Sequence, residues 1–141
     1  MISHRYPEPF LAPMREELTR IGFTQLQTVD AVDDAVQQPG TTMIVVNSIC
    51  GCAAGKARPA IALALRGDVR PDHLTTVFAG GDLEATSRAR EILAPYPPSS
   101  PSIAILKDGK LVYMMERRDI ESSGADEIAA QLTAAFVEHC A

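Results

Sequence analysis

The chain has 141 residues, 46% of them hydrophobic, which suits one compact domain with its own core over residues 1–141. Its net charge of −5 and its 5% aromatic content argue against a nucleic acid or an anionic membrane as partner. No apolar segment approaches the roughly 18 residues that span a bilayer, and the N-terminus lacks the apolar core of a secretory signal, so we expect a cytoplasmic protein.

Helical and extended patterns alternate along the first two thirds of the chain. Apolar side chains recur at helical spacing in the first helix, which places Phe10 on its buried face and Arg15 on its polar face. Thr28 and Asp82 stand where side-chain caps are expected at the start of two later helices, and Pro59 predicts a kink inside a third. The expected elements are, in chain order, a helix at residues 8–21, a strand at 23–26, a helix after residue 28, a strand at 42–46, a helix at 57–66, a strand at 74–78 and a helix at 82–93.

The last third of the chain predicts a hairpin and a closing helix. A proline-rich loop at residues 96–101 leads into a strand at 103–106, and a tight turn connects this strand to a second one at 111–115. Residues 124–138 have the periodicity of an amphipathic helix. Alternation followed by a hairpin predicts an α/β fold, with a central mixed sheet and helices on both of its faces.

The cysteines are the residues that point to chemistry. Cys50, Cys52 and Cys140 are an odd number in a chain without an export signal, so a framework of structural disulfides is not expected. Cys50 and Cys52 lie between a predicted strand and a predicted helix, and the first turn of a helix stabilises a thiolate through its unpaired N–H groups and its dipole. Because the thiolate is the nucleophile and the metal ligand, Cys50 is the candidate reactive residue. The alternative is that both are small core residues.

A thiol pair within this order of elements looks like the thioredoxin fold. In that fold a cis-proline precedes the final hairpin and lies beside the redox cysteine, and Ser100-Pro101 stands at the matching place. The usual thioredoxin motif is Cys-x-x-Cys, whereas this chain has Cys-Gly-Cys, and in this respect it closely resembles the bacilliredoxins over residues 13–140. The resemblance is carried by Val46-Asn47-Ser48-Ile49-Cys50-Gly51-Cys52-Ala53-Ala54-Gly55, Ala57-Arg58-Pro59, Val77-Phe78-Ala79-Gly80, Glu84-Ala85-Thr86 and Pro98-Ser99-Ser100-Pro101-Ser102.

The resemblance implies a thiol–disulfide oxidoreductase that removes the small thiol bacillithiol from mixed disulfides on client proteins. Bacillithiol is then a co-substrate, no cofactor is expected, and a weak disulfide reductase or isomerase activity accompanies the main one. The Cys50 thiolate attacks, and a second small thiol or Cys52 resolves the product. Gly51 leaves the sulfur uncovered, and Ser100 and Pro101 are the residues expected to pair with an extended client segment.

The direct route through Cys52 has a geometric condition. Residues two apart in a regular helix point about 200° apart around the axis, so a Cys50–Cys52 disulfide requires Gly51 to leave helical geometry. We therefore expect Cys52 to act as a conditional resolving residue.

Three alternatives stay open at the level of the sequence. The Cys-Gly-Cys turn is also suited to a soft metal such as Cu(I), Zn or an iron–sulfur cluster, although a structural zinc site needs four ligands and a second pair is missing. Lys56 and Arg58 follow the cysteines and either attract an anionic thiol or stay solvated on a charged helix face. Cys140 is either an inert tail residue or one with a packing or redox role.

Overall fold

A five-stranded mixed sheet organises the computed structural model, which describes residues 5–141. The strands are β1 (Thr24–Gln25), β2 (Thr41–Asn47), β3 (His73–Phe78), β4 (Ser102–Lys107) and β5 (Lys110–Met115). Their order across the sheet is β1-β3-β2-β4-β5. β3 pairs in parallel with both β1 and β2, whereas β4 runs antiparallel to β2 and to β5. The central strand β2 is buried along its whole length, as expected for an apolar run in the middle of a covered sheet.

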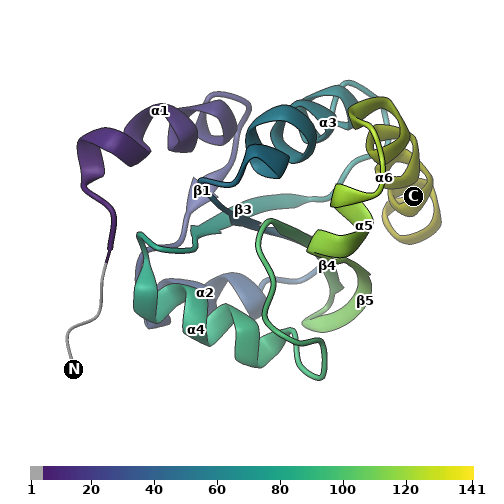
Figure 1. Ribbon diagram of the computed structural model, residues 1–141. Coiled ribbons are helices and arrows are strands. Elements are labelled where there is room, and N and C mark those ends of the chain that lie inside the picture. Colours follow the sequence, from purple (N-terminus) through teal and green to yellow (C-terminus); the bar gives the residue numbers. More distant parts are fainter. Residues whose placement is uncertain (1–4) are drawn as a thin grey trace.

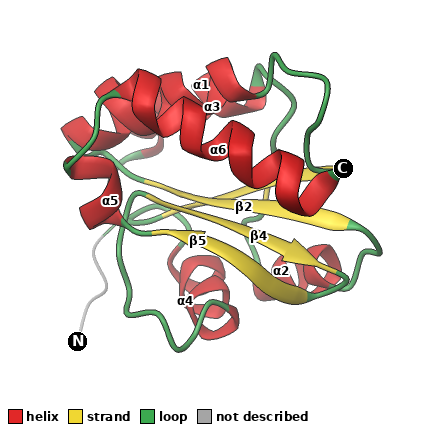
Figure 2. Ribbon diagram, turned by 90° about the vertical axis from the view of Figure 1, so that its right-hand side faces the viewer, coloured by secondary structure: helices red, strands yellow, loops and turns green. Residues whose placement is uncertain are grey.

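Helices cover both faces of this sheet (Figures 1 and 2). They are α1 (Glu8–Thr19), α2 (Val29–Val36), the π-helical turn η1 (Ala53–Ala57), α3 (Arg58–Ala64), α4 (Leu83–Ile92), α5 (Arg117–Glu121) and α6 (Ala125–Cys140). α1, α3 and α6 lie on one face, and α2 and α4 lie on the other. Each layer has its own core, one centred on Phe136 and Ile61 and one on Val77 and Ala89. The predicted α/β fold is confirmed.

The first helix differs from its prediction in which side chains it buries. Its buried residues are Leu11, Arg15 and Leu18, so Arg15 occupies the middle of the core-facing stripe, whereas Phe10 is 50% exposed. The guanidinium of Arg15 makes two bonds of 2.9 Å to the buried carboxylate of Asp82. A buried charge is tolerated when it is paired in this way, and the partner comes from a distant part of the chain.

The predicted helix caps have mixed outcomes. Thr28 accepts a hydrogen bond from the N–H of Ala31 at 3.1 Å, which confirms the cap of α2. Asp82 stands at the N-cap position of α4 but makes no capping bond. Its carboxylate accepts instead from the backbone N–H of Phe78 and from Arg15.

The segment after the cysteines is helical but is not one regular helix. The N–H of Arg58 bonds to the carbonyl of Ala53, five residues back, which makes residues 53–57 a π-helical turn. Pro59 lies in the first turn of α3, where its missing N–H is tolerated, so the irregularity precedes the proline.

Two further elements differ from the predictions near the C-terminus. The five-residue helix α5 was not predicted, and α6 continues to Cys140. Among residues 5–141, no helix is long and apolar enough to cross a membrane. The single domain over residues 1–141 and the cytoplasmic location stay predictions.

Candidate active site

The chain turns sharply where β2 ends. The side-chain oxygen of Asn47 accepts the N–H of Ser48 at 2.9 Å, and the hydroxyl of Ser48 accepts the N–H of Cys50 at 2.9 Å. Both bonds are local side-chain-to-backbone contacts that replace strand pairing with a turn. Cys50 is thereby lifted out of the buried strand and becomes partly exposed.

The sulfur of Cys50 receives a backbone donor. The N–H of Cys52 lies 3.3 Å from the Cys50 sulfur. This N–H lowers the pKa of the Cys50 thiol, and the positive charge of Arg117 adds to the same effect. A Cβ atom added at Gly51 would meet nothing within 4 Å, so the turn beside the sulfur is open. The open turn and the lowered pKa both favour an accessible thiolate at Cys50.

Cys52 is in a different environment. It is partly buried and packs against the larger core cluster. Its hydrogen bond to the Cys50 sulfur raises its pKa, and partial burial and the negative charges of Cys50 and Glu121 act in the same direction. Cys50 is therefore the thiol of the pair that loses its proton first as the pH rises.

Cys140 lies at the opposite end of the sheet. Burial raises the pKa of its thiol, which contacts Thr41 at the start of β2, whereas Cys50 follows the end of that strand. The seven residues of β2 span about 20 Å. Cys140 packs against the core rather than fraying, and it is too far away to reach Cys50 in the same molecule.

The expectation of a solvated or thiol-binding Arg58 is wrong. Arg58 is 3% exposed, and its guanidinium donates to the side chain of Asn47 at 2.9 Å and to the carbonyl of Ser48 at 3.0 Å. Its Nε pairs with Glu17 of α1 at 3.0 Å. Arg58 thus holds the turn that carries Cys50 against α1 and α3.

Lys56 is also engaged, since its ammonium donates to the carbonyl of Glu121 in α5 at 2.7 Å. This bond ties the π-helical turn to the short helix that sequence reasoning missed. Both basic residues that follow the cysteines therefore have structural partners.

The predicted proline loop borders the site. The Ser100–Pro101 peptide bond is cis, as the resemblance implied, and Pro101 is buried. Ser102 pairs with Val46 in the sheet, which places Pro101 next to Asn47, at the end of β2 that Cys50 follows. A second cis bond, Ala94–Pro95, was not predicted.

Arg117, the first residue of α5, is the site residue that sequence reasoning missed. Its N–H donates to the hydroxyl of Ser99 at 3.4 Å, and its guanidinium donates to the carbonyl of Ser100 at 3.3 Å. The one local signal was the spacing of Glu116 and Asp119, because the Asp119 carboxylate accepts the N–H of Glu116 at 2.9 Å and closes the first turn of α5.

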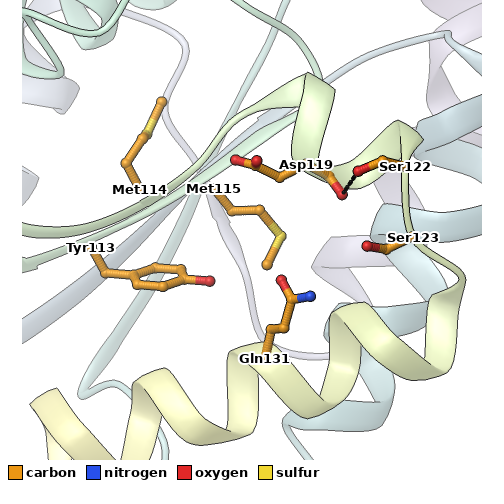
Figure 3. Close-up of a pocket in the computed structure, with 7 residues that line it drawn as sticks. All are labelled: Tyr113, Met114, Met115, Asp119, Ser122, Ser123 and Gln131. Atoms are coloured by element: carbon orange, nitrogen blue, oxygen red, sulfur yellow. Dashed lines mark hydrogen bonds between the residues drawn. The ribbon is translucent and has the colours of Figure 1, made fainter.

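A polar cavity of about 170 Å³ lies between β5, α5 and α6. In Figure 3 the hydroxyl of Tyr113, the tip of Met115 and the amide of Gln131 converge on it. No cysteine lines it, so it is separate from the thiol pair.

The structure offers few ligands for the alternative of a soft-metal site. Among residues 5–141, no group of three or more histidine, cysteine, aspartate or glutamate side chains is arranged to hold a metal ion. A soft-metal site would therefore rest on Cys50 and Cys52 alone, below the number of ligands that a closed structural site needs.

Comparison with known proteins decides the family. The family model described as Disulphide isomerase matches residues 6–140. A bacilliredoxin of Koribacter versatilis is 58% identical over 136 residues, which cover 96% of this chain and 94% of the relative. The chain belongs to the bacilliredoxin family. Another bacilliredoxin, from Cytophaga hutchinsonii, is 53% identical over 133 residues, or 94% of this chain and 98% of that one.

Solved structures place the bacilliredoxin chain in the thioredoxin fold. The oxidised mitochondrial thioredoxin 3 of Saccharomyces cerevisiae has a TM-score of 0.58 at 16% identity, covering 86% of this chain and 98% of that chain. Fasciola hepatica thioredoxin has a TM-score of 0.58 at 19% identity, with coverages of 83% and 99%. The predicted thioredoxin-like fold is confirmed. Family and fold together support a thiol–disulfide redox function.

Proposed function

We propose that this protein is a thiol–disulfide oxidoreductase that removes bacillithiol from mixed disulfides on client proteins. The observation that carries the proposal is the N–H of Cys52, 3.3 Å from the sulfur of Cys50, at an open turn. This contact lowers the pKa of Cys50 while the pKa of Cys52 is raised. A thiolate that is exposed and distinct from its neighbour is what disulfide exchange needs.

The exchange proceeds in two balanced steps. The Cys50 thiolate attacks the bacillithiol sulfur, a Cys50–bacillithiol disulfide forms, the client–bacillithiol bond breaks, and the client cysteine leaves as a thiolate. A second bacillithiol thiolate then attacks the sulfur of the bound bacillithiol and releases the Cys50 thiolate together with a small-molecule disulfide. In the conditional route, Cys52 loses its proton and attacks Cys50 instead, which releases bacillithiol and leaves a Cys50–Cys52 disulfide.

The loop beside the end of β2, next to Cys50, suits an extended client segment. Pro101 lies next to Asn47 at this end of the strand, and the Ser100 carbonyl lies in the same loop, where it accepts from Arg117. We assign Gly51, Ser100 and Pro101 to client binding, because open backbone beside the sulfur lets an extended chain approach. Attack on a protein disulfide bound in the same way gives the weaker reductase and isomerase activity.

Intact-mass measurement after mixing the reduced protein with a client peptide that bears a bacillithiol mixed disulfide tests the proposal. Wild type and Cys52→Ala are expected to gain the mass of bacillithiol, and Cys50→Ala is not. The Cys140→Ser variant is the matched control and is expected to behave as wild type. Absence of transfer in every protein, with the peptide disulfide intact, would refute the proposed function.

A further inference from the structure

Arg117 is fixed at the loop that borders Cys50. Its backbone N–H bonds to Ser99 and its guanidinium bonds to the carbonyl of Ser100, the residue before the cis-proline. Because α5 begins directly after β5, which pairs with β4, the position of Arg117 is determined by the sheet. These contacts therefore hold the guanidinium beside the loop that borders Cys50.

The charge of Arg117 acts on the sulfur of Cys50. Arg117 is among the groups that lower the pKa of Cys50, and the Cys50 thiolate in turn is among those that raise the pKa of Arg117. The other charged groups that act on the thiol pair are Glu121, on the same helix, and the thiols themselves. A negatively charged group beside the Cys50 sulfur is thus within electrostatic range of the guanidinium.

The guanidinium has donors left over. Its Nε pairs with the carboxylate of Glu121 and one Nη bonds to Ser100, which uses two of five N–H groups. The other Nη has no hydrogen-bond partner among residues 5–141, and the side chain is 44% exposed. Arg58 and Lys56 are committed to Asn47 and Glu121, so Arg117 is the arginine at the site with an accessible, unused edge. Such an edge matches the geometry of a carboxylate.

We propose that Arg117 is a specificity-determining residue that anchors the carboxylate of a small thiol while Cys50 attacks the sulfur of that thiol. The inference rests on the proposed exchange function and adds the residue that recognises the group transferred. The client cysteine carries no matching charge, so the anchor also directs attack to the sulfur of the small thiol.

Two mixed disulfides on one client peptide test the proposal. One carries mercaptosuccinate, which has two carboxylates, and the other carries 2-mercaptoethanol, which has none. Transfer onto Cys50 is timed by intact mass at a pH above the ordinary thiol pKa of about 8.5, so that the thiolate fraction does not differ between variants. The variants are Arg117→Gln, Arg117→Lys and the matched control Arg118→Gln, since Arg118 lies beside Arg117 with its side chain 82% exposed and pairs with Glu116.

The ratio of the two rates is the decisive readout. Arg117→Gln is expected to slow transfer of mercaptosuccinate about tenfold, equivalent to about 1.4 kcal/mol, and transfer of 2-mercaptoethanol less than about twofold. Arg117→Lys is expected to restore part of the ratio because it keeps the charge but not the fork. Arg118→Gln is expected to match wild type for both disulfides.

The possible failures are distinguishable. If Arg117→Gln slows both disulfides equally, while iodoacetamide still alkylates its Cys50 at the wild-type rate, Arg117 does not select for the carboxylate and this inference is wrong. If Arg117→Gln does not fold, the same comparison is made with Arg117→Lys, where an unchanged ratio would overturn the inference. If wild type transfers neither group, the proposed exchange function itself fails.

Discussion

Replacing Arg58 by methionine removes the group that holds the turn carrying Cys50. Two charge-assisted bonds are lost, to the Asn47 side chain at 2.9 Å and to the Ser48 carbonyl at 3.0 Å. Buried bonds of this type contribute about 1.5–3 kcal/mol each. The ion pair to Glu17 adds about 0–1 kcal/mol, because that carboxylate is 38% exposed. Since Asn47 keeps the N–H of Ser48, we expect a loss of roughly 3–5 kcal/mol in the free energy of unfolding.

Urea denaturation measures this loss. The midpoint of unfolding of Arg58→Met is expected to fall by roughly 2 M, whereas that of Arg58→Lys, which keeps the charge and one donor group, falls by about half as much. Glu17→Gln is the matched control for the exposed partner. If Arg58→Met loses no more stability than Glu17→Gln, the two buried bonds contribute nothing and the reasoning is refuted. A second readout is alkylation of Cys50, which only the Arg58 variants should alter.

Further predictions follow from the thiols and the glycines. The rate of alkylation of Cys50 should rise with pH through a pKa below the ordinary thiol value, because the pKa of Cys50 is lowered. Alkylation of Cys52 should rise only at higher pH, because its pKa is raised. Peptide mapping that gives the same pH profile for both cysteines would contradict this prediction. Gly51→Ala should change the free energy of unfolding by less than about 0.5 kcal/mol, because an added Cβ meets nothing within 4 Å. Gly81→Ala should lower the free energy of unfolding by about 1–3 kcal/mol, because a Cβ there lies 2.7 Å from the buried Leu11. Equal losses of stability for the two variants in urea denaturation would disprove the steric argument. Cys140→Ser should leave the rate of small-thiol transfer unchanged, and a slower rate would show that the far end of the sheet takes part.

Local patterns were sufficient to predict where the thiols lie. The β-branched run before Asn47 predicts a buried strand, the periodicity after the cysteines predicts a helix, and both are short-range signals. Thr28 was predictable for the same reason, because its partner is three residues away. The outlines of the fold and the position of the Cys-Gly-Cys turn therefore follow from the sequence.

Features that depend on distant partners were not predictable in this way. Arg15 and Arg58 both looked like surface residues, and only the folded chain brings Asp82 and Asn47 to them. Helix α5 has five residues, too few for a helical period to show. Its one local signal, the spacing of Glu116 and Asp119, marks the start of a helix but does not place Arg117 beside the proline loop. Burial of a charge is decided by tertiary structure, which a single local window does not contain.

The π-helical turn between the cysteines and α3 accommodates one residue more than a regular helical turn. A bond to the fifth residue back encloses one residue more than a bond to the fourth, so the turn amounts to one extra residue within the helix. Each residue of an α-helix rotates the chain by about 100°. The wide turn absorbs this extra residue, whereas the same insertion in a regular helix would rotate the Cys-Gly-Cys segment by that angle relative to the buried face of α3. A side chain added at Gly55 would meet nothing within 4 Å, so we expect the π-helical turn to accept a substitution there.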